Sequence, residues 1–254
     1  AVSASGKTRI YNCAKEPEII WLCRFLKKMG ASIQGEGTEE ILIEGGKIIQ
    51  GADMQVPPDR IVAGTYLCAA AATRGRIEIQ NPPQGELTAF LEVYRKMGGQ
   101  YEWNSGKLVA DGSRVRFPVS MTETAAYPGF PTDLQSLLMA VLATIPGKSC
   151  ILESVFEDRF KITGELNRMG AEIRTEGRKA WIRGTSDLQG GYLQAQELRG
   201  GAALVVAALA ARGESIVEGY SFICRGYEDI VQDISDLGGK IKKDTGMTTY
   251  EYIQ

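Results

Sequence analysis

The sequence predicts an α/β protein made of repeated units of about seventy residues, each a helix, a strand, a second helix and one or two further strands. Two markers keep the same period. Amphipathic stretches end in a Met-Gly or Leu-Gly signal whose glycines are Gly30, Gly98, Gly170 and Gly238, spaced 68, 72 and 68 residues apart. Small apolar residues run into a glycine and then a strand at Gly6, Gly75, Gly147 and Gly213. Two markers with one period indicate internal repetition.

The first helix of each complete unit is apolar almost all round. These helices are predicted at 59–73, 132–145 and 198–211, and their composition is typical of buried helices. The second helices are amphipathic, as in GYEDIVQDISDLGG (226–239), where Ile230, Ile234 and Leu237 keep a helical spacing. Three buried helices favour a threefold arrangement with the helices inside and the strands around them.

The repeats also predict two domains. Residues 58–254 hold three complete units, at 58–126, 127–196 and 197–254, which we expect to close one domain. Residues 1–57 hold the tail of a fourth unit, because only AVSAS precedes Gly6. Pro57 and Pro58 mark the boundary, since neither proline can donate a backbone hydrogen bond or continue a helix.

Composition excludes several classes of function. The 29 basic and 31 acidic residues give a net charge of −2, which argues against a nucleic-acid partner. The longest apolar run, 202–211, is too short to span a bilayer, and no signal peptide is evident, so we expect a soluble, cytoplasmic protein with no membrane partner. The five cysteines are widely spaced and suggest reduced thiols. Without histidine, proton transfer must use carboxylates, lysine, tyrosine or cysteine.

The run YPGFPTDLQ (127–135) holds the sharpest candidate for chemistry. Thr132 and Gln135 have the spacing of a capping box, which puts Asp133 in the first helical turn. Asp133 is then either an acid at a helix start, where its negative charge interacts favourably with the helix dipole, or a catalytic carboxylate. In the second case the rigid Pro-Gly-Phe-Pro segment before it fixes the direction of the carboxylate.

Several arginines lie where strands turn into helices. Arg159, in ESVFEDRF (153–160), is either a solvated partner of Glu157 or Asp158 or a guanidinium placed for a phosphate or carboxylate. Similar positions belong to Arg60, Arg199 and Arg225. A cation near a helix N-terminus opposes the dipole. Arginines converging on one face would therefore make an anion pocket.

Together, the motifs PGFPTDLQ, ESVFEDRF, LRGGAALVVAALAARG and RGYED, with AKEPEI and PPDRIVAGTYLCAAA upstream, resemble the UDP-N-acetylglucosamine 1-carboxyvinyltransferases, a family of enolpyruvyl transferases. The resemblance implies an inside-out α/β barrel of two domains with substrates between them. It implies transfer of the enolpyruvyl group of phosphoenolpyruvate to the 3′-hydroxyl of UDP-N-acetylglucosamine, with release of phosphate, in peptidoglycan precursor synthesis. Neither a cofactor nor a metal is implied.

The resemblance also assigns site residues. Asp133 matches the family's candidate base, which contacts the sugar hydroxyl, and Val155 matches a residue whose backbone contacts the UDP-sugar. Arg159 and Arg225 match arginines of the cleft, Arg225 being the expected phosphoenolpyruvate contact, and Arg199 belongs to the same anion site. Glu197 and Cys224 stand where the family commonly has aspartate, which changes the partners of the neighbouring arginines.

The resemblance begins inside the family's first domain, so we expect a C-terminal portion of the enzyme that is inactive without its missing N-terminal part. The family's mobile loop with its catalytic cysteine has no counterpart in this sequence. Two alternatives stay open. One is a 3-phosphoshikimate 1-carboxyvinyltransferase, which shares the fold and the chemistry. The other is a non-catalytic module that binds a sugar nucleotide or a protein.

Overall fold

The computed structural model describes residues 1–46, 49–244 and 251–253, and it divides into two compact units. Unit 1 comprises residues 1–58 and 126–129, and unit 2 comprises residues 59–125 and 130–254. In unit 1, helix α1 (Pro17–Lys28) packs on an antiparallel sheet of order β1-β3-β2, formed by β1 (Gly6–Tyr11), β2 (Ser32–Gln34) and β3 (Glu40–Gly45). That this unit is the remnant of another barrel domain stays a prediction.

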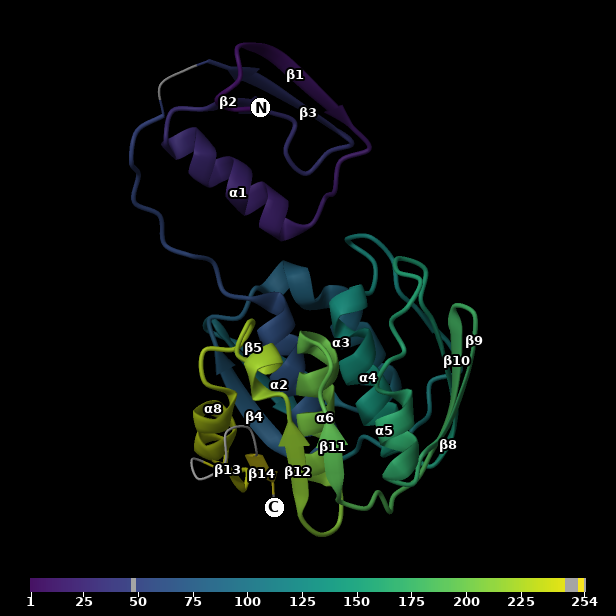
Figure 1. Cartoon of the computed structure of the whole chain (residues 1–254). Coiled ribbons are helices and arrows are strands. Elements are labelled where there is room, and N and C mark those ends of the chain that lie inside the picture. The colour runs from purple at the N-terminus through teal and green to yellow at the C-terminus, as the bar shows by residue number, and fades with distance from the viewer. Residues whose placement is uncertain (47–48, 245–250, 254) are drawn as a thin grey trace. The chain divides into compact units, whose positions relative to one another are not determined.

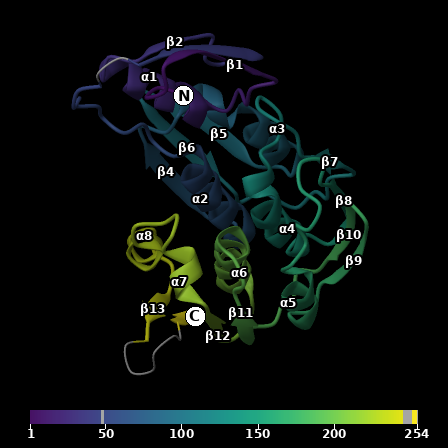
Figure 2. The ribbon, with the colours of Figure 1, turned by 45° about the horizontal axis from the view of Figure 1, so that its top comes forward.

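Three buried helices form the centre of unit 2 (Figures 1 and 2). They are α2 (Arg60–Thr73), α4 (Gln135–Ala143), which continues the short 3₁₀ helix η2 (Thr132–Leu134), and α6 (Leu198–Ala210). Each of the three packs against the other two. The predicted buried helices and their mutual arrangement are therefore confirmed, within a few residues at their ends. Gly64 lets η2 approach α2, since a Cβ at Gly64 would lie 2.5 Å from Cδ1 of Leu134.

Three sheets surround these helices (Figure 2). The first has the order β4-β6-β5, from β4 (Arg76–Gln80), β5 (Gln100–Asn104) and β6 (Lys107–Asp111). The second has the order β7-β8-β10-β9, from β7 (Thr122–Glu123), β8 (Gly147–Leu152), β9 (Glu172–Glu176) and β10 (Lys179–Gly184). The third has the order β11-β12-β14-β13, from β11 (Tyr192–Gln194), β12 (Ser215–Glu218), β13 (Ile241–Lys243) and β14 (Glu251–Ile253).

Each repeat of unit 2 also contains a second helix, which the sequence predicts to be amphipathic. They are η1 (Gln84–Leu87) with α3 (Thr88–Lys96), α5 (Thr163–Arg168) and α8 (Ile230–Asp236). The last is shorter than predicted, because Asp229 caps it by accepting from the N–H of Gln232. A short helix that was not predicted, α7 (Tyr220–Ile223), precedes it. No helix among the described residues is long and apolar enough to cross a membrane.

Candidate functional site

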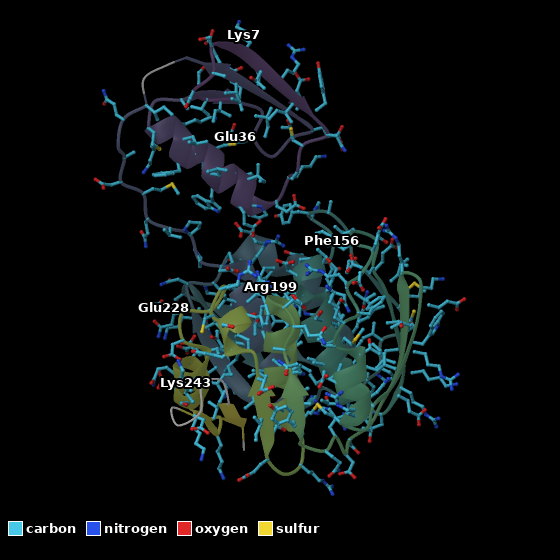
Figure 3. All side chains as sticks on the ribbon, viewed as in Figure 1. Lys7, Glu36, Phe156, Arg199, Glu228 and Lys243 are labelled. Atoms are coloured by element: carbon cyan, nitrogen blue, oxygen red, sulfur yellow. The ribbon has the colours of Figure 1, made fainter. Side chains whose placement is uncertain are left out.

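The starts of two buried helices bring a carboxylate and two guanidinium groups together in unit 2. Asp133 lies in η2, at the approach to α4. Arg199 is the second residue of α6, and its side chain is labelled in Figure 3. Asp133 Oδ2 accepts from Nε and Nη2 of Arg199 at 3.3 and 3.2 Å. Asp133 Oδ1 accepts from Nη2 of Arg159, which comes from the loop after β8. We name Asp133, Arg159 and Arg199 the arginine–aspartate cluster.

The carboxylate is the accessible member of this cluster. The side chain of Asp133 is 37% exposed, against 19% for Arg159 and 14% for Arg199. Nη1 of Arg199 is buried and has no acceptor among the described residues. The cluster therefore presents a carboxylate to solvent while retaining one guanidinium N–H group without a protein partner.

Arg159 does not have the partners that the first of its two interpretations predicted, and its role as an anion contact stays a prediction. The arginine does not pair with its neighbours Glu157 and Asp158, which contact Arg178 and Lys161 instead. Its guanidinium lies 4.7 Å from the centroid of the Phe156 ring, and its Nε donates to Oγ1 of Thr132 at 3.3 Å. These contacts hold the guanidinium group of Arg159 so that it points toward Asp133.

The predicted capping box was wrong. Pro131 precedes η2 and no side chain caps the helix there. The hydroxyl of Thr132 donates to Oε2 of Glu153 at 2.9 Å, and Nε2 of Gln135 is buried without a partner among the described residues. Tertiary structure thus redirects Thr132 away from its own helix.

Glu153 is the residue of this site that sequence reasoning missed. It directly follows β8 and is 1% exposed. Its Oε1 accepts from the N–H groups of Val155 and Phe156 at 2.9 and 3.0 Å, while its Oε2 accepts from Thr132. Glu153 thereby ties the loop that carries Arg159 to the helix that carries Asp133. The only sequence signal was an acid at the end of an apolar strand.

Val155 is 42% exposed, as a ligand contact requires. Its N–H is occupied by Glu153. A backbone contact from Val155 to a ligand would therefore have to use the carbonyl oxygen.

Arg225 does not join the cluster by any side-chain contact among the described residues, and it is exposed. Its neighbour Gly226 does reach the cluster, since a Cβ there would lie 3.2 Å from Nη1 of Arg199 and 2.9 Å from Leu198. Next to it, Tyr227 shares a hydrogen bond of 2.7 Å with Thr65 of α2. Burial raises the pKa of Tyr227, and the hydrogen bond with Thr65 and the nearby charge of Arg199 oppose part of that shift.

The other predicted residues have local roles. Glu197 caps α6 by accepting from the N–H groups of Arg199 and Gly200, and Arg60 is buried at the start of α2. Cys224 is a free, exposed thiol. The described residues contain no group of three or more side chains suited to hold a metal ion.

Residues 1–234 match the family model of EPSP synthase (3-phosphoshikimate 1-carboxyvinyltransferase). The UDP-N-acetylglucosamine 1-carboxyvinyltransferase 2 of Caldanaerobacter subterraneus is 44% identical over 241 residues, which cover 95% of this chain and 58% of that protein. Its namesake from Carboxydothermus hydrogenoformans is 45% identical over 246 residues, covering 96% of this chain and 58% of that protein. The chain thus spans under two thirds of the length of these curated relatives.

Solved structures show the same fold. The enolpyruvyl transferase NikO from Streptomyces tendae has a TM-score of 0.82 and 24% identity, over 93% of this chain and 57% of that one. EPSP synthase from Acinetobacter baumannii has a TM-score of 0.68 and 19% identity, over 92% and 57%. The predicted inside-out α/β fold is confirmed. By sequence and by fold, the chain belongs to the EPSP synthase family of enolpyruvyl transferases.

Proposed function

We propose that this chain supplies the sugar-nucleotide side of an enolpyruvyl transfer from phosphoenolpyruvate to the 3′-hydroxyl of UDP-N-acetylglucosamine, in peptidoglycan precursor synthesis. The observation that carries the proposal is the accessible carboxylate of Asp133 held between two guanidinium groups. The identity of 44–45% to UDP-N-acetylglucosamine 1-carboxyvinyltransferases supports this acceptor over shikimate 3-phosphate. The five free cysteines support a reducing compartment, and we place the reaction in the cytoplasm.

The cluster suits this chemistry because its ion pairs can be exchanged. Both oxygens of the Asp133 carboxylate accept hydrogen bonds from guanidinium groups. Phosphoenolpyruvate carries a phosphate and a carboxylate, and guanidinium groups bind both kinds of anion strongly. When Arg159 and Arg199 turn to these anions, Asp133 is released to accept the proton of the attacking sugar hydroxyl.

Other residues would complete the site. Arg225 is exposed and has no side-chain partner among the described residues, so it can contact phosphoenolpyruvate without breaking an ion pair. The carbonyl of Val155 can contact the UDP-sugar. The part of the relatives that this chain does not span would supply the remaining groups, including the acid that protonates the enolpyruvyl carbon.

Calorimetric titration of residues 1–254 with UDP-N-acetylglucosamine and with shikimate 3-phosphate tests the proposal. We expect preferential binding of the UDP-sugar and a loss of at least about tenfold in affinity for Asp133→Asn, because a charge-assisted hydrogen bond is lost. Asp187→Asn is the matched control. Asp187 pairs with Arg212 just beyond the other end of α6, about 20 Å away, and affinity should not change.

Preference for shikimate 3-phosphate would support the alternative acceptor. Equal affinity of the wild type and Asp133→Asn for the UDP-sugar would contradict the role of the cluster, as would the absence of binding.

A further inference from the structure

The loop that follows β8, residues 153–158, lies beside the arginine–aspartate cluster and exposes two apolar side chains. Those of Val155 and Phe156 are 42% and 51% exposed, whereas Ile151, within β8, is 0% exposed. The ring of Phe156, which is labelled in Figure 3, has its centroid 4.7 Å from the guanidinium carbon of Arg159. The loop thus presents apolar residues to solvent next to a member of the cluster.

The peptide geometry of this loop fixes the direction of the Val155 carbonyl. The peptide bonds of the loop are trans, and in a planar trans peptide the C=O and the N–H point in opposite directions. The N–H groups of Val155 and Phe156 donate to Oε1 of Glu153, at 2.9 and 3.0 Å, and Glu153 is 1% exposed. The Val155 carbonyl therefore points away from this buried carboxylate. It accepts no hydrogen bond among the described residues.

Ser154 is held by all three of its polar groups. Its N–H donates to Oγ1 of Thr124 at 2.9 Å, its carbonyl accepts from Nη1 of Arg178 at 2.8 Å, and its hydroxyl donates to Oε1 of Glu123 at 2.7 Å. The Ser154 carbonyl and the Val155 N–H belong to one peptide plane. Arg178 thus holds the side of this plane that the buried carboxylate does not. We name Thr124, Ser154 and Arg178 the Ser154 clamp.

Strand pairing places both anchors of the clamp. In the second sheet β8 lies between β7 and β10. Thr124 follows β7, and its N–H continues the parallel pairing by donating to the carbonyl of Leu152 at 2.9 Å. Arg178 precedes β10, and its carbonyl accepts from the N–H of Glu153 at 2.8 Å, which continues the antiparallel pairing. The loop is therefore anchored from both neighbours of β8.

The fold does not require the clamp, because its side chains are particular to the second sheet. The backbone bond between Glu153 and Arg178 recurs in the first sheet, where the N–H of Asn81 donates to the carbonyl of Gly106 at 2.8 Å. Gly106 stands in the place of Arg178 and has no side chain. In the third sheet Gly219 stands in the place of Glu153 and leads directly into α7. The clamp thus belongs to the loop that borders the arginine–aspartate cluster.

We propose that Arg178 and Thr124 are positioning residues for the acceptor substrate, because by fixing the Ser154 peptide they direct the Val155 carbonyl toward the UDP-sugar. The inference rests on the proposed function, in which that carbonyl contacts the UDP-sugar. A carbonyl that is oriented before binding reduces the entropy lost on binding. Thr124 is 0% exposed, so it acts on a ligand through the loop alone. The second contact of Arg178, with Glu157 at 3.6 Å, is an exposed ion pair that contributes little.

Calorimetric titration of residues 1–254 with UDP-N-acetylglucosamine tests this role. Arg178→Met keeps much of the apolar stem and removes the donor to Ser154. We expect the Kd to rise at least about fivefold, because a hydrogen bond that holds the loop is lost. Arg178→Lys keeps one donor and should restore part of the affinity. The matched control is Arg174→Met, in the exposed arginine of β9 in the same hairpin, and the affinity should not change.

Thr124→Val separates positioning from direct contact with the ligand. Valine keeps the size of the buried side chain but offers no acceptor to the N–H of Ser154, so we expect the Kd to rise at least about threefold. The double variant with Arg178→Met should lose less affinity than the product of the two single losses, since both substitutions release the same residue. If Arg178 touched the UDP-sugar itself, Thr124→Val would leave the Kd unchanged, and the proposal would be overturned.

Amide hydrogen exchange tests the clamp without a ligand. The Val155 amide shares its peptide plane with the Ser154 carbonyl. It should therefore exchange at least about threefold faster in Arg178→Met than in the wild type. In Arg174→Met it should exchange as in the wild type, and the two variants should have similar Tm values.

A wild-type Kd in Arg178→Met would overturn this inference and leave the proposed function intact. Unchanged exchange of the Val155 amide in Arg178→Met would also overturn it. A wild-type chain that did not bind the UDP-sugar would contradict the proposed function and this inference together, whatever the exchange rates.

Discussion

At the scale of single residues, the hydrogen bonds of Glu153 hold the parts of the candidate site together. Glu153 is a buried carboxylate with three donors, two from backbone N–H groups and one from Thr132. These bonds fix the relative positions of the loop after β8 and of η2. We infer that Glu153 positions Arg159 and Asp133 without touching the reacting groups.

Replacement of Glu153 by Ala should lower the free energy of unfolding by about 1–3 kcal/mol or more, because buried donors lose their acceptor. Urea denaturation measures this loss, and amide exchange at Val155 and Phe156 should accelerate. Glu153→Gln, which keeps one acceptor oxygen, should restore part of the stability.

Glu157→Gln is the control for this prediction. The Glu157 side chain is 90% exposed, and its ion-pair partner among the described residues is Arg178, at 3.6 Å. The effect of this substitution should therefore stay within about 0.5 kcal/mol. If Glu153→Ala were equally mild, Glu153 would have no positioning role.

For single residues, the sequence predicted the candidate site residues but not the residues that they contact. Asp133 and Arg199 were found because both begin buried helices. That they meet follows from the packing of α4 against α6, which joins positions 66 residues apart. Glu153 was missed because its partner Thr132 lies 21 residues earlier in the chain.

Among the elements, the close contact of α2 with η2 depends on a residue without a side chain. A Cβ at Gly64 would overlap Leu134, which directly follows Asp133. Gly64→Ala should destabilise the protein by about 1–3 kcal/mol, since overpacking outweighs the better helix propensity of alanine. Thermal unfolding measures the change.

Gly164 provides the opposite case within a helix. A Cβ there meets nothing within 4 Å, so Gly164→Ala in α5 should stabilise by about 0.5–1 kcal/mol. Two variants that shifted stability in the same direction would contradict this account of helix packing.

The elements also differ in how well sequence predicts them. The buried helices carry long apolar runs, so their existence and approximate bounds were predictable. The strands β7 and β11 have only two and three residues, too few to show a period, and they form because a neighbouring strand accepts them. Helix α8 begins at Ile230, the first apolar residue of the predicted spacing, because Asp229 caps it.

On the scale of the whole molecule, the seventy-residue period predicted a threefold set of buried helices, and the structure has it. The net charge of −2 gave no sign of a local anion site. Two guanidinium groups that meet at one carboxylate are a local arrangement, and the sum of charges over the chain does not describe it.

The most direct test of the proposed enolpyruvyl transfer is phosphate release by a chimera in which residues 1–254 replace the matching residues of the Geobacillus kaustophilus relative, which is 41% identical and aligns with 100% of this chain. We predict release from phosphoenolpyruvate that depends on UDP-N-acetylglucosamine, and a loss of about 10²–10⁴-fold in kcat for Asp133→Ala, because the general base is gone. Circular dichroism should show that this variant keeps the fold. Normal turnover by the Asp133→Ala chimera, or turnover with shikimate 3-phosphate in place of the UDP-sugar, would contradict the account.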